Sequence, residues 1–214
     1  MAKKKLLHLS ELAHFSNVFQ HRKDLKGMWQ ESVFKNNNNI TLELGCGKGE
    51  YSISLARQFI TRNFIGIDIK GSRIWRGAKT ALEENRINVV FLRAYIDHLT
   101  EYFTSEEVHE IWIPFPDPYP ENRNARKRLT AARFLDRYRK ILKPGGIIHL
   151  KTDDMMLYTF TLETLEKNDC RIIFCSDNIL PLYETDKMLS IQTFYEQKHI
   201  SKGKTIKYIR FSFK

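Results

Sequence analysis

Residues 114–128, PFPDPYPENRNARKR, combine an acid and an aromatic residue with a dense run of basic side chains. Asp117 and Tyr119 stand between prolines, and four basic residues follow: Arg123, Arg126, Lys127 and Arg128. A carboxylate can stabilise positive charge that develops in a reaction, and an aromatic ring can stack on a nucleobase. Guanidinium groups bind phosphates. The segment therefore predicts a loop that acts on nucleic acid, with a solvated surface run as the alternative.

A second candidate is the glycine-rich segment LELGCGKGE at residues 42–50. Gly45, Gly47 and Gly49 permit a tight turn and close approach of a ligand to the backbone. Asp68 ends the next apolar run, where an acid can hydrogen-bond a ribose diol. A glycine pattern alone also occurs in purely structural turns, so the nucleotide interpretation depends on Asp68.

Glu43 and the spacing of the glycines indicate which nucleotide cofactor this segment can bind. Glu43 would repel a pyrophosphate, and the G-x-G-x-G pattern is not the dinucleotide G-x-G-x-x-G. S-adenosylmethionine has no phosphate and carries an ammonium and a sulfonium group, which suit a nearby acid. The segment resembles the cofactor loop of class I methyltransferases, with Cys46 as a small residue that fills the turn rather than a nucleophile.

Predicted strands and helices, which must position these residues, alternate along the chain. Seven strands are predicted, at residues 40–44, 63–69, 89–92, 110–115, 147–152, 171–176 and 205–213. Helices are expected from residue 50, at residues 74–82 and after Thr130, which is a candidate N-cap, and KPGG at residues 143–146 ends the last of these. Asp153 or Asp154 can cap a further helix. The pattern predicts an α/β fold with a doubly wound, mostly parallel sheet, Rossmann-like, and the resemblance implies an antiparallel last strand. Ligands of such sheets bind beyond the carboxyl ends of the strands.

Charge and composition favour a polyanion partner. The 214 residues carry a formal net charge of +10, concentrated in residues 1–30, 121–140 and 197–214. Such asymmetry suggests nucleic acid, although basic surfaces also keep proteins soluble. Four asparagines at residues 36–39 suggest a linker between a basic N-terminal arm, residues 1–38, and a catalytic domain, residues 39–214. Three cysteines and no long apolar segment predict a cytoplasmic protein without disulfides or a membrane partner. We also expect no metal, and a monomer or homodimer.

Three segments together indicate one family among the class I methyltransferases. PFPDPYPENRNARKRL, LKTDD and TFYEQKHISKGKTI resemble the bacterial tRNA (guanine-N7)-methyltransferases in order and spacing, over about residues 40–213. The resemblance implies S-adenosylmethionine-dependent methylation of a guanosine in the tRNA variable loop, position 46 in tRNA numbering.

The resemblance also implies roles for individual residues. Contacts to the cofactor are implied for Glu43, Gly45, Gly47, Gly49, Asp68, Tyr95 and Asp117, and Asp117 is also the candidate catalytic residue. Contacts to the guanosine are implied for Tyr119, Glu121, Asp153, Thr193, Tyr195 and Glu196. Contacts to the RNA backbone are implied for Arg123, Asn124, Arg126, Lys127 and Arg128. The family usually has Trp at Tyr119, Lys at Glu121, His at Asn124 and Asp at Tyr95.

Local patterns leave alternatives open for several of these residues. Asp153 can be a helix cap, Thr193 and Glu196 fit a capping box, and Tyr195 can belong to the core. Two other functions also remain. One is methylation of an exocyclic amine of a nucleobase, since D-P-Y is similar to the [N/D]-P-P-[YF] loop of such enzymes. The other is a non-catalytic RNA-binding module on a methyltransferase fold.

Overall fold

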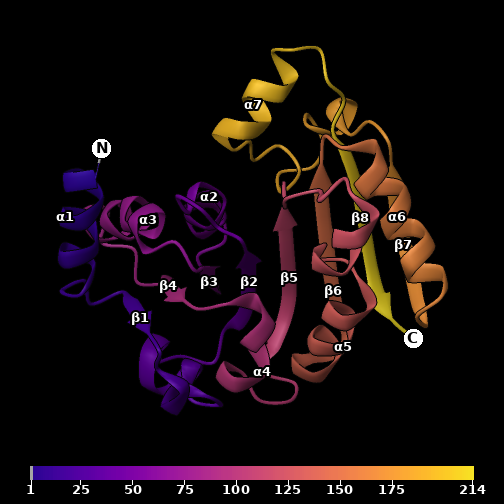
Figure 1. Ribbon diagram of the computed structural model, residues 1–214. Helices are drawn as coiled ribbons and strands as arrows, with labels where there is room; N and C mark the ends of the chain where they lie inside the picture. Colours follow the sequence, from indigo (N-terminus) through magenta and orange to yellow (C-terminus); the bar gives the residue numbers. More distant parts are fainter. Residues whose placement is uncertain (1) are drawn as a thin grey trace.

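A computed structural model describes the backbone of residues 2–214 and the side chains of residues 5–214 (Figure 1). The strands form one sheet in the order β1-β4-β3-β2-β5-β6-β8-β7. Their bounds are β1 Val18–Gln20, β2 Asn39–Leu44, β3 Arg62–Asp68, β4 Val89–Arg93, β5 Val108–Pro114, β6 Leu142–Thr152, β7 Cys170–Ser176 and β8 Lys207–Phe213. The α-helices are α1 Ala2–Leu12, α2 Glu50–Gln58, α3 Gly71–Glu83, α4 Leu99–Tyr102, α5 Ala132–Ile141, α6 Met155–Glu166 and α7 Phe194–Ile200.

The topology confirms the predicted fold class. Strands β1 to β6 pair in parallel, whereas β8 runs antiparallel to both β6 and β7. The chain leaves β2 for β3 on one side and later returns to β5 on the other. This switch point lies between β2 and β5, where doubly wound sheets bind their ligands.

The sheet has eight strands where seven were predicted. The additional strand is β1, which lies within the predicted N-terminal arm and pairs with β4. Three residues are too few to show a periodic pattern, so the sequence gives no signal for it. Residues 18–34 also contribute to the core, because Trp29 is fully buried and its indole nitrogen donates to the Tyr102 carbonyl (2.9 Å). The division of the chain at residue 38 stays a prediction.

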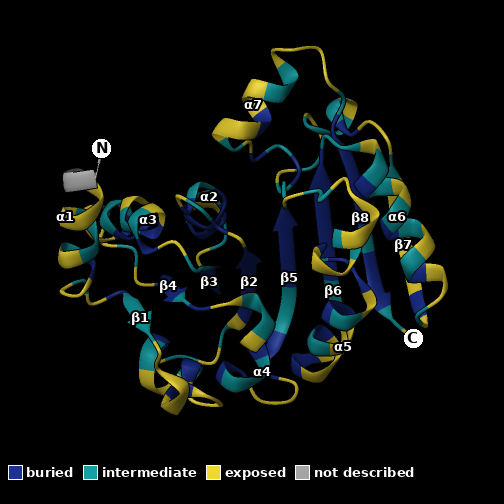
Figure 2. Cartoon of the chain, in the orientation of Figure 1, coloured by how far each residue is buried: buried dark blue, intermediate teal, exposed yellow. Residues whose placement is uncertain are grey.

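Helices cover both faces of the sheet, and the central strands β2, β3, β4 and β5 are largely buried, whereas residues 171–175 of β7 are exposed (Figure 2). On one face, residues of α4, α5 and α6 pack against the central strands. On the other face, α2 and α3 pack with the segment that connects β7 to β8, and α1 lies against α3 (Figure 1). Strands buried on both faces explain the near-continuous apolar runs of the sequence.

The structure corrects one predicted cap and decides another. Thr130 does not cap α5, whose N-cap is Ala131; the buried Thr130 hydroxyl instead bonds that of Thr161 (2.7 Å). Asp154 is the N-cap of α6, since its carboxylate accepts from the Leu157 amide (2.7 Å). Asp153 therefore has no capping role and is available for the site described below.

The described part of the chain lacks two kinds of feature. None of its helices has the length and apolar character needed to cross a membrane. Among residues 2–214 there is also no group of three or more His, Cys, Asp or Glu side chains placed to hold a metal ion.

Candidate active site

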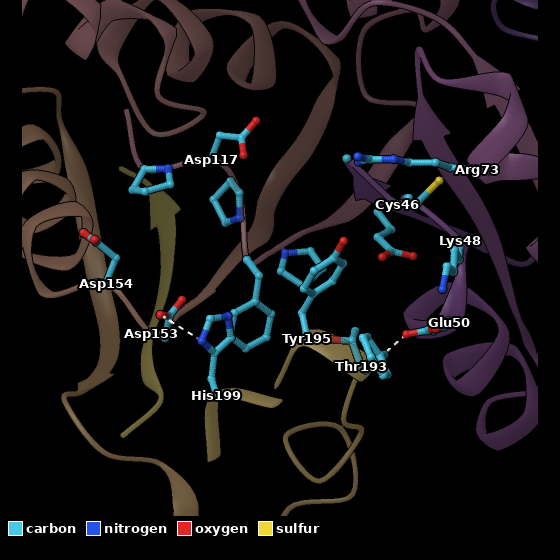
Figure 3. A pocket seen from close by; sticks show the side chains of 18 of the residues that line it. Cys46, Lys48, Glu50, Arg73, Asp117, Asp153, Asp154, Thr193, Tyr195 and His199 are labelled. Atoms are coloured by element: carbon cyan, nitrogen blue, oxygen red, sulfur yellow. Dashed lines mark hydrogen bonds and ion pairs between the residues drawn. The ribbon is translucent and has the colours of Figure 1, made fainter. Parts of the chain in front are cut away.

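A cavity of about 470 Å³ lies at the carboxyl ends of β2, β5 and β6. The loops after these strands and the start of α7 line it, so segments far apart in the sequence meet there (Figure 3). Seven of the predicted site residues line this cavity: Glu43, Gly45, Gly47, Asp117, Asp153, Thr193 and Tyr195. In Figure 3, Asp153 and His199 lie on one side, Lys48 and Glu50 on the other, and Tyr195 between them.

A second cavity, of about 530 Å³, adjoins the first, because Gly45 lines both. Its other lining residues include Asp68, Tyr95, Tyr119, Arg126 and Lys127. The predicted site residues are thus divided between two neighbouring compartments. The glycine-rich loop lies between the compartments, as expected for a loop that supports one extended ligand.

The glycine-rich loop fits a ligand that contacts the backbone. Gly45, Gly47 and Gly49 all have φ in the left-handed region, which disfavours other residues. A Cβ on Gly45 would meet no atom within 4 Å, so this side of the loop is open. A Cβ on Gly49 would lie 2.5 Å from Phe91, which makes Gly49 a packing position. Asp68 supports the turn by accepting from the Gly47 amide (3.0 Å).

Two buried side chains beside the loop are held in their neutral forms. Burial raises the pKa of Cys46 well above its ordinary value, so its thiol stays protonated. Burial also raises the pKa of Glu43 to about 8, although hydrogen bonds from the amide (2.8 Å) and hydroxyl of Ser52 oppose this shift. Glu43 thus lines the cavity and bonds α2 through Ser52.

The raised pKa of Glu43 predicts a pH dependence of stability. Between pH 4.5 and about 8 the folded protein retains a proton that the unfolded chain has released, so stability falls as pH rises through this window. Glu43→Gln keeps the acceptor for Ser52 and removes the titration. Urea denaturation of both proteins across this range should show the wild type losing stability relative to the variant, by at most about 1.4 kcal/mol per pH unit. Parallel pH curves would show that Glu43 does not titrate in this way.

The loop after β5 is fixed by a buried arginine. Arg128 is only 3% exposed, and its guanidinium donates to the carbonyls of Pro118 (3.0 Å) and Tyr119 (2.9 Å). Tyr119 has φ of 45°, in the left-handed region, so these hydrogen bonds support a strained turn. Arg128, predicted to contact RNA, is therefore occupied within the protein. Arg123, Arg126 and Lys127 are exposed, and Arg123 and Asn124 also bond Glu121.

Helix α7 brings the last motif over the cavity. Thr193 caps it, since its hydroxyl accepts from the Glu196 amide (3.2 Å), and Tyr195 is exposed. Glu196, predicted to contact the substrate, is fully buried outside the cavity lining. Its carboxylate pairs with the buried Lys151 ammonium (2.7 Å) and accepts from Tyr183. The pair of Glu196 with Lys151 therefore attaches α7 to β6.

Three basic residues of the site were missed by sequence reasoning. His199 and Lys204 both approach the Asp153 carboxylate, at 3.1 Å and 2.5 Å. Lys151 also donates to the carbonyls of Leu189 (3.0 Å) and Ile191 (3.1 Å), so it organises the segment before α7. His199 and Lys204 stood in the quoted motif TFYEQKHISKGKTI, but the sequence carried no sign that they converge on Asp153.

Comparison with known proteins places the chain in a family. A family model described as "Putative methyltransferase" matches residues 37–209. A tRNA (guanine-N(7)-)-methyltransferase of Christiangramia forsetii is 46% identical to it, over 100% of this chain and 99% of its own. The chain belongs to the tRNA (guanine-N(7)-)-methyltransferase family. Other members are those of Bacteroides thetaiotaomicron, 43% identical over 99% of this chain and 86% of its own, and Clostridium novyi, 35% identical over 87% and 86%.

Solved structures confirm the fold of this tRNA (guanine-N(7)-)-methyltransferase family member. The 16S rRNA methyltransferase KamB superposes with a TM-score of 0.65 at 15% identity, covering 84% of this chain and 90% of its own. An antibiotic-related methyltransferase gives a TM-score of 0.65, also at 15% identity, covering 92% and 96%. At this identity the likeness concerns the arrangement of helices and strands, which agrees with the predicted class I methyltransferase architecture.

Proposed function

We propose that this family member transfers a methyl group from S-adenosylmethionine to N7 of a guanosine in the tRNA variable loop, position 46 in tRNA numbering. The supporting observation is that the glycine-rich loop, the DPYP loop and the start of α7 line one cavity. These segments are distant in sequence, and the two last carry the motifs of the family. A site that binds both a methyl donor and a nucleobase requires such convergence.

The residues of the two cavities fit the donor. Asp68 and Tyr95 line the compartment that we propose for the ribose and adenine of the donor. The open side of Gly45 allows the donor to approach the backbone of the glycine-rich loop closely. Asp117 lines the other compartment together with Glu43, and the Asp117 carboxylate suits an ammonium group. S-adenosylmethionine supplies the methyl group as part of a sulfonium cation.

Methylation of guanine N7 requires the protein to align the reactants and to stabilise positive charge, but it requires no proton acceptor. Guanine N7 has a lone pair in the ring plane and no proton to lose, so its attack requires alignment with the methyl group. The methylated ring gains positive charge, which Asp117 and Asp153 can stabilise from the cavity wall. Tyr195, exposed at the cavity, offers an aromatic face on which the guanine can stack.

The proposal is tested by incubating the protein with labelled S-adenosylmethionine and unmodified tRNA, then mapping the methylated nucleoside. The expected product is 7-methylguanosine in the variable loop. Label on an exocyclic amine would instead establish the alternative enzyme. No transfer to any tRNA, with tRNA binding retained, would favour the non-catalytic RNA-binding module.

The basic run predicts a specific salt dependence. Arg126 and Lys127 are exposed beside the second cavity, and we propose that they bind RNA phosphates. The Arg126→Ala/Lys127→Ala variant should lower the slope of log affinity against log salt by roughly 0.7 to 0.9 per lost contact. Filter binding of tRNA over a salt series measures this slope. An unchanged slope would identify the run as a solvated surface.

Arg128→Ala provides the contrast within the same run. Because Arg128 is buried and bonds the loop carbonyls, its loss should lower the thermal stability of the protein. The salt slope of a folded Arg128→Ala protein should stay close to that of the wild type.

A further inference from the structure

Helix α7 is attached to the rest of the protein from two sides of the site. From β6 and the residue that follows it, Lys151 pairs with Glu196 and Asp153 approaches His199. From the cofactor side, the Glu50 carboxylate accepts a hydrogen bond from the Phe194 amide (2.8 Å). Glu50 is the first residue of α2, directly after the glycine-rich loop. The contact therefore joins the proposed cofactor loop to the proposed substrate helix.

The Phe194 amide is a group that needs a partner. It belongs to the first turn of α7, whose amides have no acceptor within the helix. The Thr193 side chain accepts from Glu196, and Glu50 serves Phe194 from another element. Lys48 of the glycine-rich loop adds a cation–π contact to the Phe194 ring, 5.4 Å from its centroid. A carboxylate at a helix N-terminus is favourably placed with respect to the helix dipole.

The residue that makes this bond directly precedes a side chain of the cavity. Tyr195 follows Phe194 and lines the cavity, between Asp153 and His199 on one side and Lys48 and Glu50 on the other (Figure 3). The Lys151 contact at Glu196 and the Asp153 contact at His199 attach the first turn and the end of α7 to the β6 side of the site. On the other side, the Glu50 hydrogen bond and the Lys48 contact with the Phe194 ring attach the start of α7 to the glycine-rich loop.

We propose that Glu50 is a positioning residue, which holds Tyr195 over the cavity by its hydrogen bond to the Phe194 amide. This inference rests on the proposed function, since the bound base is taken to be guanine of tRNA. It requires the carboxylate oxygen as an acceptor and does not require its charge. It also requires no contact between Glu50 and the methyl donor.

Two variants separate acceptor from charge. Glu50→Gln keeps an oxygen acceptor and loses the charge, whereas Glu50→Ala loses both. Glu163→Ala serves as the matched control, because Glu163 is exposed on α6, away from the site. The measurements are KM and kcat with tRNA, calorimetric affinity for S-adenosylmethionine, and hydrogen exchange of the peptide covering α7.

The expected pattern differs between the variants. Glu50→Ala should raise KM for tRNA roughly tenfold, as for the loss of one hydrogen bond, and should speed exchange in the first turn of α7. Glu50→Gln and Glu163→Ala should stay within about twofold of the wild type. Affinity for S-adenosylmethionine should stay unchanged in all three.

Other outcomes overturn the inference. Tighter tRNA binding by both Glu50 variants would assign the residue a purely electrostatic role, because both remove a negative charge near RNA. Weaker S-adenosylmethionine binding would make Glu50 a cofactor ligand. Unchanged exchange in Glu50→Ala would show that the hydrogen bond does not hold α7. If the wild type methylates no tRNA, the proposed function fails, while the exchange experiment still tests the contact itself.

Discussion

A tRNA that carries 7-deazaguanosine at the target position is expected to accept no methyl group from this enzyme. The analogue replaces N7 by a carbon and so lacks the lone pair that attacks the methyl group, while its exocyclic amine is intact. No His or Lys is present in residues 114–122, next to the proposed methyl site, to accept a proton from an amine. The loop around Asp117 therefore favours an acceptor atom that has no proton to lose. Transfer is measured as incorporation of labelled methyl.

Binding must be measured in parallel with transfer. Retained affinity for the analogue tRNA, together with absent transfer, would identify N7 as the acceptor. Methylation of the analogue at the wild-type rate would contradict the proposal and support the exocyclic amine. In the same assay with ordinary tRNA, Asp117→Ala should depress kcat more than tRNA affinity, if Asp117 acts on the charge that develops in the transition state.

Lys151→Met is expected to destabilise the protein by about 3–5 kcal/mol, since it leaves the Glu196 carboxylate buried without its cation. Both side chains are fully buried, and Lys151 also bonds the Leu189 and Ile191 carbonyls. Burial lowers the pKa of Lys151, but the Glu196 carboxylate opposes this shift and favours the charged ammonium. Urea denaturation measures the loss as a lower midpoint.

A second variant shows whether the ion pair is the cause. Lys151→Met/Glu196→Gln removes both charges and keeps an acceptor for the Tyr183 hydroxyl, so it should regain most of the lost stability. Arg22→Met, which breaks the exposed pair with Asp24, should leave the urea midpoint unchanged. A double variant as unstable as Lys151→Met alone would assign the effect to packing and to the carbonyl bonds of Lys151.

The acid pair at the end of β6 illustrates where the sequence left a choice. Asp153 and Asp154 both precede α6, and either can supply the N-cap oxygen, so local pattern does not distinguish them. The fold assigns the cap to Asp154 and directs Asp153 toward His199 and Lys204. The choice depends on the direction in which the chain leaves β6, which is set by packing of α6 against the sheet.

Two further charged residues show that local sequence does not reveal which partners a side chain meets in the fold. The family resemblance implied a contact to RNA for Arg128, in the basic run, and a contact to the guanosine for Glu196, at capping-box spacing from Thr193. Both are buried in the structure, Arg128 against the loop carbonyls and Glu196 against Lys151. A buried charge needs a partner from another element, and a partner distant in sequence leaves no mark in the local pattern.

The sequence by itself determined the fold class, the glycine-rich loop and the family, because these depend on periodicity, on turn residues and on motifs that are continuous in the chain. Only the tertiary structure decided which charged residues meet. The ends of β2, β5 and β6 lie side by side in the sheet, so the loops that follow them share one cavity. Helix α7 reaches that cavity through Glu50, Lys151 and Asp153, whose contacts span long sequence separations. Such contacts are fixed by the order of strands and by burial, which no local segment encodes.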